Sequence, residues 1–161
     1  MAQRVVVKLK CGERVWVINT HLHHTQDQAG DAERLAQVGL IVDWCSMEAA
    51  QQRRIAHTIF LGDLNASPGT PCYNCVLNNG FRSAYVEATG AEPTHTFPTG
   101  LQAPFMDNLT YDHPVVTDYV FHRGDLLHVE RAQIMANTPH DKDATLYASD
   151  HMAIVIQFQR K

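Results

Sequence analysis

A long helical pattern between two apolar runs is the feature that most constrains how this chain can fold. Residues 15–18 and 58–61 are rich in β-branched and aromatic side chains, which predicts two short buried strands. From about residue 30 to residue 54, apolar side chains such as Leu35, Val38 and Cys45 recur at three- and four-residue spacing. A strand, a long helix and a second strand in this order predict a βαβ-like crossover or a layered α/β arrangement.

The rest of the chain adds elements to this α/β arrangement, and the length predicts a single domain over residues 1–161. Alternating apolar residues before a polar turn at 10–13 predict an N-terminal hairpin. Thr70-Pro71 predicts the start of a short helix that ends near Gly80. Further strands are predicted at 115–121, 127–135 and 154–158. The intervening stretch, 81–114, is rich in Gly and Pro, which predicts a long loop. Within it, residues 94–97 are expected on the surface, with a pocket lining as the alternative.

The composition narrows the class of protein. The formal net charge of −4 argues against a strongly basic protein that binds nucleic acid without sequence preference. No apolar run approaches the length of a membrane span, and the first residues lack a signal-peptide pattern. The four cysteines form no regular framework, which is typical of free thiols in a reducing compartment. We therefore expect a cytoplasmic or nuclear protein.

Polar side chains follow both of the first two predicted buried strands. Asp63 and Asn65 follow the run 58–61, and His21 follows the run 15–18. Residues i and i+2 of an extended strand end point to the same side, so Asp63 and Asn65 are expected to project together. Asp, Asn, Ser, Pro and Gly are also ordinary turn residues. A plain turn after the second strand and a surface loop around His21 are therefore the alternatives.

Two more acidic positions accompany later strands. Asp118 lies within the apolar run 115–121, where a carboxylate needs a partner, and Asp150-His151 directly precedes the last strand. In an antiparallel or mixed sheet, the ends of all these strands can meet at one edge. The converging carboxylates would suit Mg²⁺, which neutralises phosphate charge and orients or activates water. A carboxylate bonded to a histidine would fix the tautomer of the imidazole and support its positive form.

Four short motifs occur here in an order that resembles the endonuclease/exonuclease/phosphatase superfamily. They are Asn19-Thr20-His21-Leu22, Gly62-Asp63-Leu64-Asn65-Ala66-Ser67-Pro68, Thr117-Asp118-Tyr119-Val120 and Ser149-Asp150-His151. That superfamily includes apurinic endonucleases, pancreatic-type deoxyribonucleases, sphingomyelinases, deadenylases and inositol-polyphosphate phosphatases. The resemblance implies part of a four-layer α/β sandwich, in which two sheets are flanked by helices.

The motifs resemble the second half of that domain only. The first half of the domain supplies an Asn and a metal-binding Glu, and the residues before Asn19 match neither. The only acidic residue among them, Glu13, lies in the predicted hairpin turn. We therefore expect a truncated product, a split subunit or a fragment. Such a chain is expected to leave an apolar sheet face exposed, and to associate with itself or with a missing N-terminal half.

The resemblance also implies a role for each matched residue. Asp63 resembles the carboxylate that orients or deprotonates the attacking water, and Asn65 resembles the amide that holds the nucleophile and the phosphate. His21 resembles the imidazole that contacts a phosphate oxygen. His151 resembles the catalytic histidine, and Asp118 the carboxylate that orients it. Whether Asp63 or His151 acts as the base is open.

These roles predict a metal-dependent phosphoesterase that hydrolyses its substrate by attack of water. The implied metal ligands are Asp150, Asp63 and Asn65, and the implied ion is Mg²⁺, with Mn²⁺ as an alternative. The substrate is open among a nucleic acid, a phospholipid headgroup and a small phosphate ester. Two other interpretations remain. One is a zinc hydrolase that uses the histidines of residues 20–24, and the other is a catalytically inactive fragment that acts as a binding or regulatory module.

Overall fold

This computed structural model describes residues 1–51, 55–101 and 113–161. Its strands are β1 Ala2–Lys8, β2 Arg14–His21, β3 Ile55–Asp63, β4 Arg82–Ser83, β5 Asp118–Gly124, β6 Leu127–Met135 and β7 Ala153–Arg160, and its helices are α1 Gln28–Gln51, α2 Pro71–Asn78 and α3 Ala84–Thr89. The predicted hairpin, long helix, short helix and later strands are all present. Residues 52–54 of the predicted helical pattern and residues 102–112 of the predicted loop lie outside the described residues.

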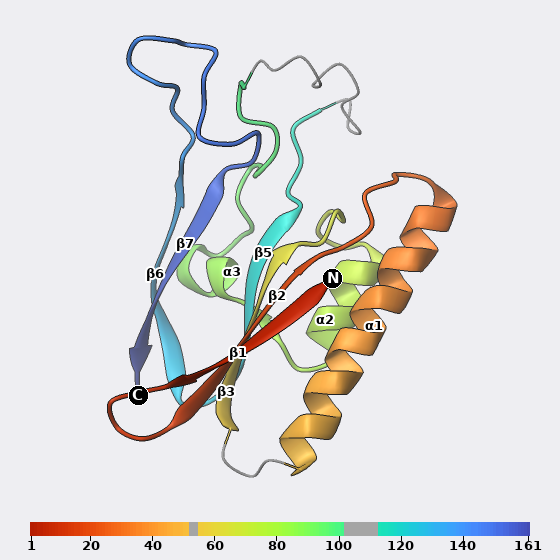
Figure 1. Cartoon of the computed structure of the whole chain (residues 1–161), viewed down its shortest axis with the longest axis vertical. Helices are drawn as coiled ribbons and strands as arrows, with labels where there is room; N and C mark the ends of the chain where they lie inside the picture. The colour runs from red at the N-terminus through yellow and green to blue at the C-terminus, as the bar shows by residue number, and fades with distance from the viewer. Residues whose placement is uncertain (52–54, 102–112) are drawn as a thin grey trace.

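The strands form a five-stranded sheet in the order β1-β2-β3-β5-β4 and a separate antiparallel pair, β6–β7. In the larger sheet, β2 and β3 are parallel and are connected through α1, which confirms the predicted βαβ crossover, whereas the other pairs are antiparallel. The helices α1 and α2 lie on one side of this sheet and β6–β7 on the other (Figure 1). The chain therefore has an α/β fold, as predicted.

Local signals set the ends of the two short helices. The Thr70 side chain accepts a hydrogen bond from the backbone N–H of Tyr73, and Pro71 occupies the first turn, as predicted for α2. The helix α3 was not predicted, because it is too short to show a helical period. Its ends still carry the usual signals, since the Ser83 hydroxyl caps the first turn and Gly90 closes the last turn with a φ of 90°.

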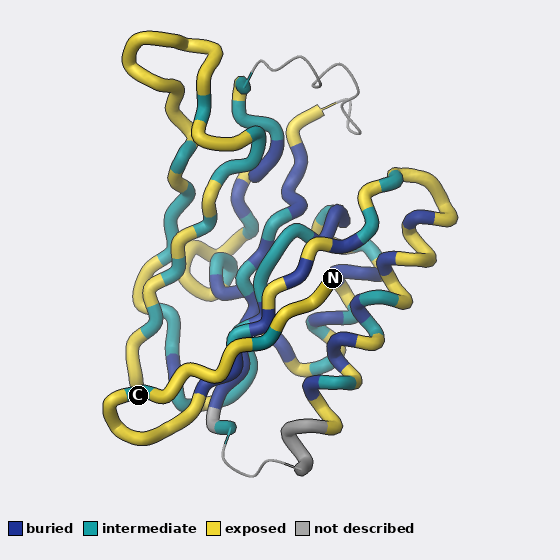
Figure 2. Tube along the Cα trace, in the orientation of Figure 1, coloured by how far each residue is buried: buried dark blue, intermediate teal, exposed yellow. Residues whose placement is uncertain are grey.

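The two faces of the larger sheet are buried to different extents. On the helix side, Ile18, Phe60 and Phe121 are each 0% exposed and pack with residues of α1 and α2 in the main core. Ile59 and Val120, which alternate with these core residues, face the β6–β7 side and are only partly buried. Figure 2 shows buried and intermediate residues along the strands of this sheet. The core therefore lies between the sheet and the helices, and the opposite face is less completely covered.

Candidate active site

Strand pairing places three of the predicted residues side by side at one end of the larger sheet. In the parallel pair β2–β3, His21 lies opposite Asp63, and in the antiparallel pair β3–β5, Asp63 lies opposite Asp118. Gly62 allows the close approach of β2 to β3 just before this point, because a Cβ built on it would lie 1.9 Å from the Thr20 carbonyl oxygen. The register of the sheet thus brings an imidazole and two carboxylates together, as predicted.

Asp63 and Asn65 meet through a turn. Asn65 has a φ of 49°, in the left-handed region, so the expectation of an extended backbone at this position is wrong. The backbone N–H of Asn65 donates to Asp63 Oδ1 at 2.7 Å, and its side-chain amide donates to Asp63 Oδ2 at 3.4 Å and to the Leu22 carbonyl at 3.1 Å. The turn interpretation therefore holds, and this turn fixes the Asp63 carboxylate. The predicted contact of Asn65 with a phosphate stays a prediction.

His151 completes the cluster from the segment before β7. Its Nδ1 lies 2.9 Å from Asp118 Oδ2, and its Nε2 lies 3.9 Å from Asp63 Oδ2. The carboxylate of Asp118 accepts the Nδ1–H, which leaves Nε2 directed towards Asp63. The predicted pairing of Asp118 with His151 is therefore present in the geometry.

Thr96, from the loop stretch 94–97, holds Asp118 in place, a role that the sequence did not predict. Thr96 is 0% exposed, and its hydroxyl donates to Asp118 Oδ2 at 2.8 Å while accepting from the backbone N–H groups of Thr117 and Asp118. The Thr117 hydroxyl donates to the same carboxylate oxygen at 3.1 Å. Three donors, counting His151, therefore converge on Asp118 Oδ2.

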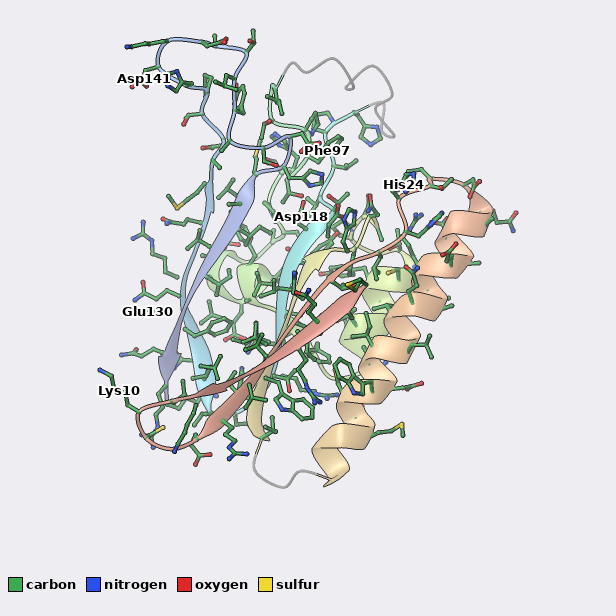
Figure 3. All side chains as sticks on the ribbon, in the orientation of Figure 1. Lys10, His24, Phe97, Asp118, Glu130 and Asp141 are labelled. Carbon is green, nitrogen blue, oxygen red and sulfur yellow. The ribbon has the colours of Figure 1, made fainter. Side chains whose placement is uncertain are left out.

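The expectation that residues 94–97 form a surface loop is thus wrong for its second half. Phe97 is 6% exposed, and its ring packs against the His151 ring with centroids 4.7 Å apart. Asp118 and Phe97 lie at the same end of the molecule as the β2–α1 loop that carries His24 (Figure 3). The stretch 94–97 is joined to the segment before β7, because the N–H of Met152 donates to the Thr96 carbonyl. Its Gly- and Pro-rich surroundings masked this role in the sequence.

His21 and Asp150 lie at the border of the cluster. The His21 side chain is 70% exposed, and its Nε2 lies 3.5 Å from Asp63 Oδ2. Its contact with a phosphate oxygen stays a prediction. The Asp150 carboxylate accepts from the Ser149 hydroxyl, and its backbone carbonyl accepts from the N–H of Thr99. The negative charge of Asp150 acts on the neighbouring His151. Its role as a metal ligand stays a prediction.

The charged side chains of this cluster shift the pKa values of Asp63 and His151. Burial, followed by the negative charge of Asp118, raises the pKa of Asp63, although the Asn65 N–H and the two nearby histidines oppose the shift. Burial would lower the pKa of His151, but the hydrogen bond and charge of Asp118, together with Asp63 and Asp150, outweigh it and raise that pKa. The site therefore favours an imidazolium at His151 and a basic carboxylate at Asp63.

The donor set fits a divalent cation. Among the described residues, Asp63, Asp118 and His151 form a group whose potential ligand atoms all lie within 4.8 Å of one another. A bound cation would relieve the repulsion between the two carboxylates, and hard cations take oxygen ligands. A cleft of about 210 Å³ opens beside Asp118, between Leu61 and Val120 of the larger sheet and Ile154 of β7.

The zinc interpretation gains no support from this geometry. Within the described part of the chain, the group of potential metal ligands includes neither His23 nor His24. His23 instead pairs with Glu33 of α1, at 3.6 Å between Nδ1 and Oε2. The cysteines are free thiols, as predicted, and no helix among the described residues has the length and apolar character of a membrane span.

Known structures share this fold. The human Nocturnin catalytic domain with bound sulfate is 21% identical with a TM-score of 0.69, and the match covers 99% of this chain and 52% of Nocturnin. D. rerio TDP2 in complex with a single-strand DNA product is 17% identical with a TM-score of 0.70, at 98% and 61% coverage. The endonuclease/exonuclease/phosphatase from Bacteroides vulgatus is 19% identical with a TM-score of 0.66, at 99% and 55% coverage.

The resemblance seen in the sequence motifs is therefore confirmed at the level of the fold, which is that of a partial endonuclease/exonuclease/phosphatase domain. The chain spans between 52% and 61% of the length of these three structures. No family model matches the chain. No curated protein matches it either.

Proposed function

We propose that this chain carries the histidine–carboxylate half of a divalent-metal-dependent phosphoesterase that hydrolyses its substrate by in-line attack of water. The observation that carries the proposal is the convergence of Asp63, Asp118 and His151, whose potential ligand atoms all lie within 4.8 Å of one another. The fold shared with Nocturnin and TDP2 supports the same reaction class.

The residues of this chain suit distinct steps of that reaction. Asp63 orients the water and accepts its proton, because burial and the charge of Asp118 make its carboxylate more basic. Asp118 holds His151 and raises its pKa, which favours the positive imidazole that donates from Nε2 to the phosphoryl group or to the leaving oxygen. The exposed imidazole of His21 contacts a phosphate oxygen. We therefore propose Asp63, rather than His151, as the base.

The metal site is proposed at the two carboxylates of Asp63 and Asp118, with Asp150 and Asn65 as further candidates. When bound, Mg²⁺ or Mn²⁺ would neutralise phosphate charge and lower the pKa of water. Asp118 keeps its second oxygen for this purpose, because the hydrogen bonds from Thr96, Thr117 and His151 all go to Oδ2.

The substrate class that we propose is a nucleic-acid phosphodiester. The support for this class is that a TDP2 with this fold is known in complex with a single-strand DNA product. Because the net charge is −4, binding of a nucleic acid would depend on contacts at the site rather than on a general attraction to the phosphate backbone. A short single-stranded DNA and bis(p-nitrophenyl) phosphate are therefore the two substrates to compare.

A binding or regulatory module is the second candidate. It is favoured by one observation, which is that the chain covers only 52–61% of the matched structures. Such a module would keep the metal site and bind the phosphoester without turnover.

The experiment combines metal binding with hydrolysis. Titration calorimetry with Mn²⁺ is expected to give heat that Asp63→Asn removes and that Asp43→Asn, at an exposed position of α1, retains. Phosphodiester hydrolysis is expected to fall by about 10²–10⁴-fold in His151→Ala and to persist in His24→Ala, an exposed histidine at the same end of the molecule. Binding without hydrolysis would identify the module, and no heat with either Mn²⁺ or Mg²⁺ would refute the metal site.

A further inference from the structure

Two buried histidines lie between the two sheets, apart from the candidate active site. His57 of β3 and His122 of β5 are 1% and 0% exposed. Nε2 of His57 lies 3.2 Å from Nδ1 of His122. Both rings also pack edge-on against Phe158 of β7, with centroid separations of 6.3 and 5.4 Å. The imidazoles are therefore part of the contact between the larger sheet and β6–β7.

Glu87 of α3 connects this pair to two other strands, β4 and β6. Its Oε2 lies 3.0 Å from His122 Nε2 and accepts from Arg82 Nε of β4 at 3.1 Å. Its Oε1 accepts from the backbone N–H of Val129 of β6 at 3.3 Å. Burial would raise the pKa of Glu87, but these hydrogen bonds outweigh it and lower that pKa, so the group is a carboxylate near neutral pH.

These contacts fix the protons of both imidazoles. The Glu87 carboxylate only accepts, so His122 must carry its proton on Nε2, and its Nδ1 is then an acceptor. His57 must therefore donate from Nε2, which leaves its own Nδ1 without a proton. That Nδ1 is buried and has no hydrogen-bond partner among the described residues. We call Glu87, His122 and His57 the histidine relay. Both of its imidazoles are neutral, and a further proton would have no hydrogen-bond acceptor in the buried space.

We propose that protonation of this histidine relay releases β6–β7 from the five-stranded sheet at mildly acidic pH. A proton on His57 Nδ1 would place an unpaired N–H and a positive charge in a buried space beside Phe158. A proton on His122 Nδ1 would set two N–H donors against each other. Either change is relieved when the sheets separate and water reaches the imidazoles.

The surrounding charges leave this direction unchanged. Arg82 and Lys161 disfavour a positive His57, whereas Asp125 favours it, and Glu87 favours a positive His122. Burial, followed by the charge of His122, lowers the pKa of His57 from 6.5 to about 4. Burial also lowers the pKa of His122, against the opposing effect of Glu87.

The pH range follows from these directions. An exposed histidine binds its proton more tightly than the buried His57, so the open state takes up a proton that the closed state refuses. The closed packing is fully stable above the ordinary histidine pKa of 6.5, and its stability falls as the pH drops from there towards about 4. Within this range, one proton changes the opening equilibrium by about tenfold per pH unit.

Hydrogen exchange of the whole chain tests the proposal. After correction for intrinsic rates, protection of β6 and β7 is expected to fall between about pH 6.5 and about pH 5, while α2 keeps its protection. His57→Gln still donates to His122 and leaves His122 as the only imidazole of the pair that can take up a proton, so its β6–β7 protection is expected to fall less than that of the unaltered chain. His140→Gln, at an exposed position, is the matched control and is expected to follow the unaltered chain. Equal loss in His57→Gln, or no loss in the unaltered chain, would overturn the proposal.

A second measurement needs no variant, and it tests the protonation of the two histidines even if His57→Gln does not fold. Nitrogen-15 NMR of the imidazoles near neutral pH is expected to show His57 and His122 neutral, each with its proton on Nε2. A proton on Nδ1 of either ring, or a charged His57 at this pH, would contradict the relay.

Discussion

The hydroxyl of Thr96 offers the sharpest test of how the candidate site is held together. It donates to Asp118 Oδ2 at 2.8 Å and accepts from the backbone N–H groups of Thr117 and Asp118 at 3.0 and 3.2 Å. Thr96→Val keeps the shape of the side chain and removes all three hydrogen bonds. Because Thr96 is 0% exposed, water cannot replace the hydroxyl without disturbing the packing.

The expected cost follows from these three bonds. A hydrogen bond to a charged group contributes about 1.5–3 kcal/mol, and a buried group left without a partner costs about 1–3 kcal/mol. These contributions overlap, so we expect Thr96→Val to lower the free energy of unfolding by about 2–5 kcal/mol. Urea unfolding followed by circular dichroism measures this change. In a chain of this size the midpoint temperature should fall by about 2–4 °C for each kcal/mol.

Two variants separate the hydroxyl from the rest of the side chain. Thr96→Ser keeps the hydroxyl and loses one methyl group, so its cost should stay near 1 kcal/mol, about that of a buried CH₂. Thr94→Val, at an exposed position of the same loop, should change stability by less than about 0.5 kcal/mol. A Thr96→Val chain as stable as Thr94→Val, or a Thr96→Ser chain as unstable as Thr96→Val, would refute the reasoning.

Two further predictions concern the sheet. Gly62→Ala should lower the free energy of unfolding by more than about 3 kcal/mol or prevent folding, because its Cβ would lie 1.9 Å from the Thr20 carbonyl oxygen. Gly39→Ala, in open space on α1, should stabilise the chain. Equal urea midpoints for the two variants would contradict this. The chain alone should associate through the edge strand β1, where Val5, Val6 and Val7 are 59%, 47% and 40% exposed. Sedimentation should show smaller species for Val6→Lys than for Leu40→Lys. An unaltered chain that is monomeric and binds no hydrophobic dye would contradict this prediction.

The parts of the fold that the sequence predicted are those with a repeated pattern. The helix α1, the crossover and the strands β5 to β7 each carry several apolar residues at a regular spacing, so one misplaced residue does not hide the element. The gathering of His21, Asp63 and Asp118 was also predicted, although the sequence placed Asp118 inside a strand over 115–121 and the structure begins β5 at Asp118. The parallel and antiparallel pairing then brings strand ends to the same edge of the sheet.

The contacts that the sequence did not reveal depend on single positions. Thr96 lies in a loop, and its importance comes from one hydroxyl that meets a carboxylate 22 residues away in the chain. The relay of His57, His122 and Glu87 joins residues from two strands and a helix too short to show a period. A histidine in an apolar run gives no indication of its partner, because the partner is set by sheet register and by packing between layers.

The incomplete burial of one sheet face bears directly on the candidate site. The cleft beside Asp118 is bounded by Leu61, Val120 and Ile154, which lie on the half-buried side of the sheet rather than in the helix-facing core. A polypeptide that covers this face would therefore also cover the cleft, shield Asp118 from bulk water and strengthen its interaction with a cation. If chains associate over this face, hydrolysis and association should therefore be coupled. Activity should rise with chain concentration more steeply than in proportion, and strict proportionality over the range in which the chain associates would show that the site works without a cover.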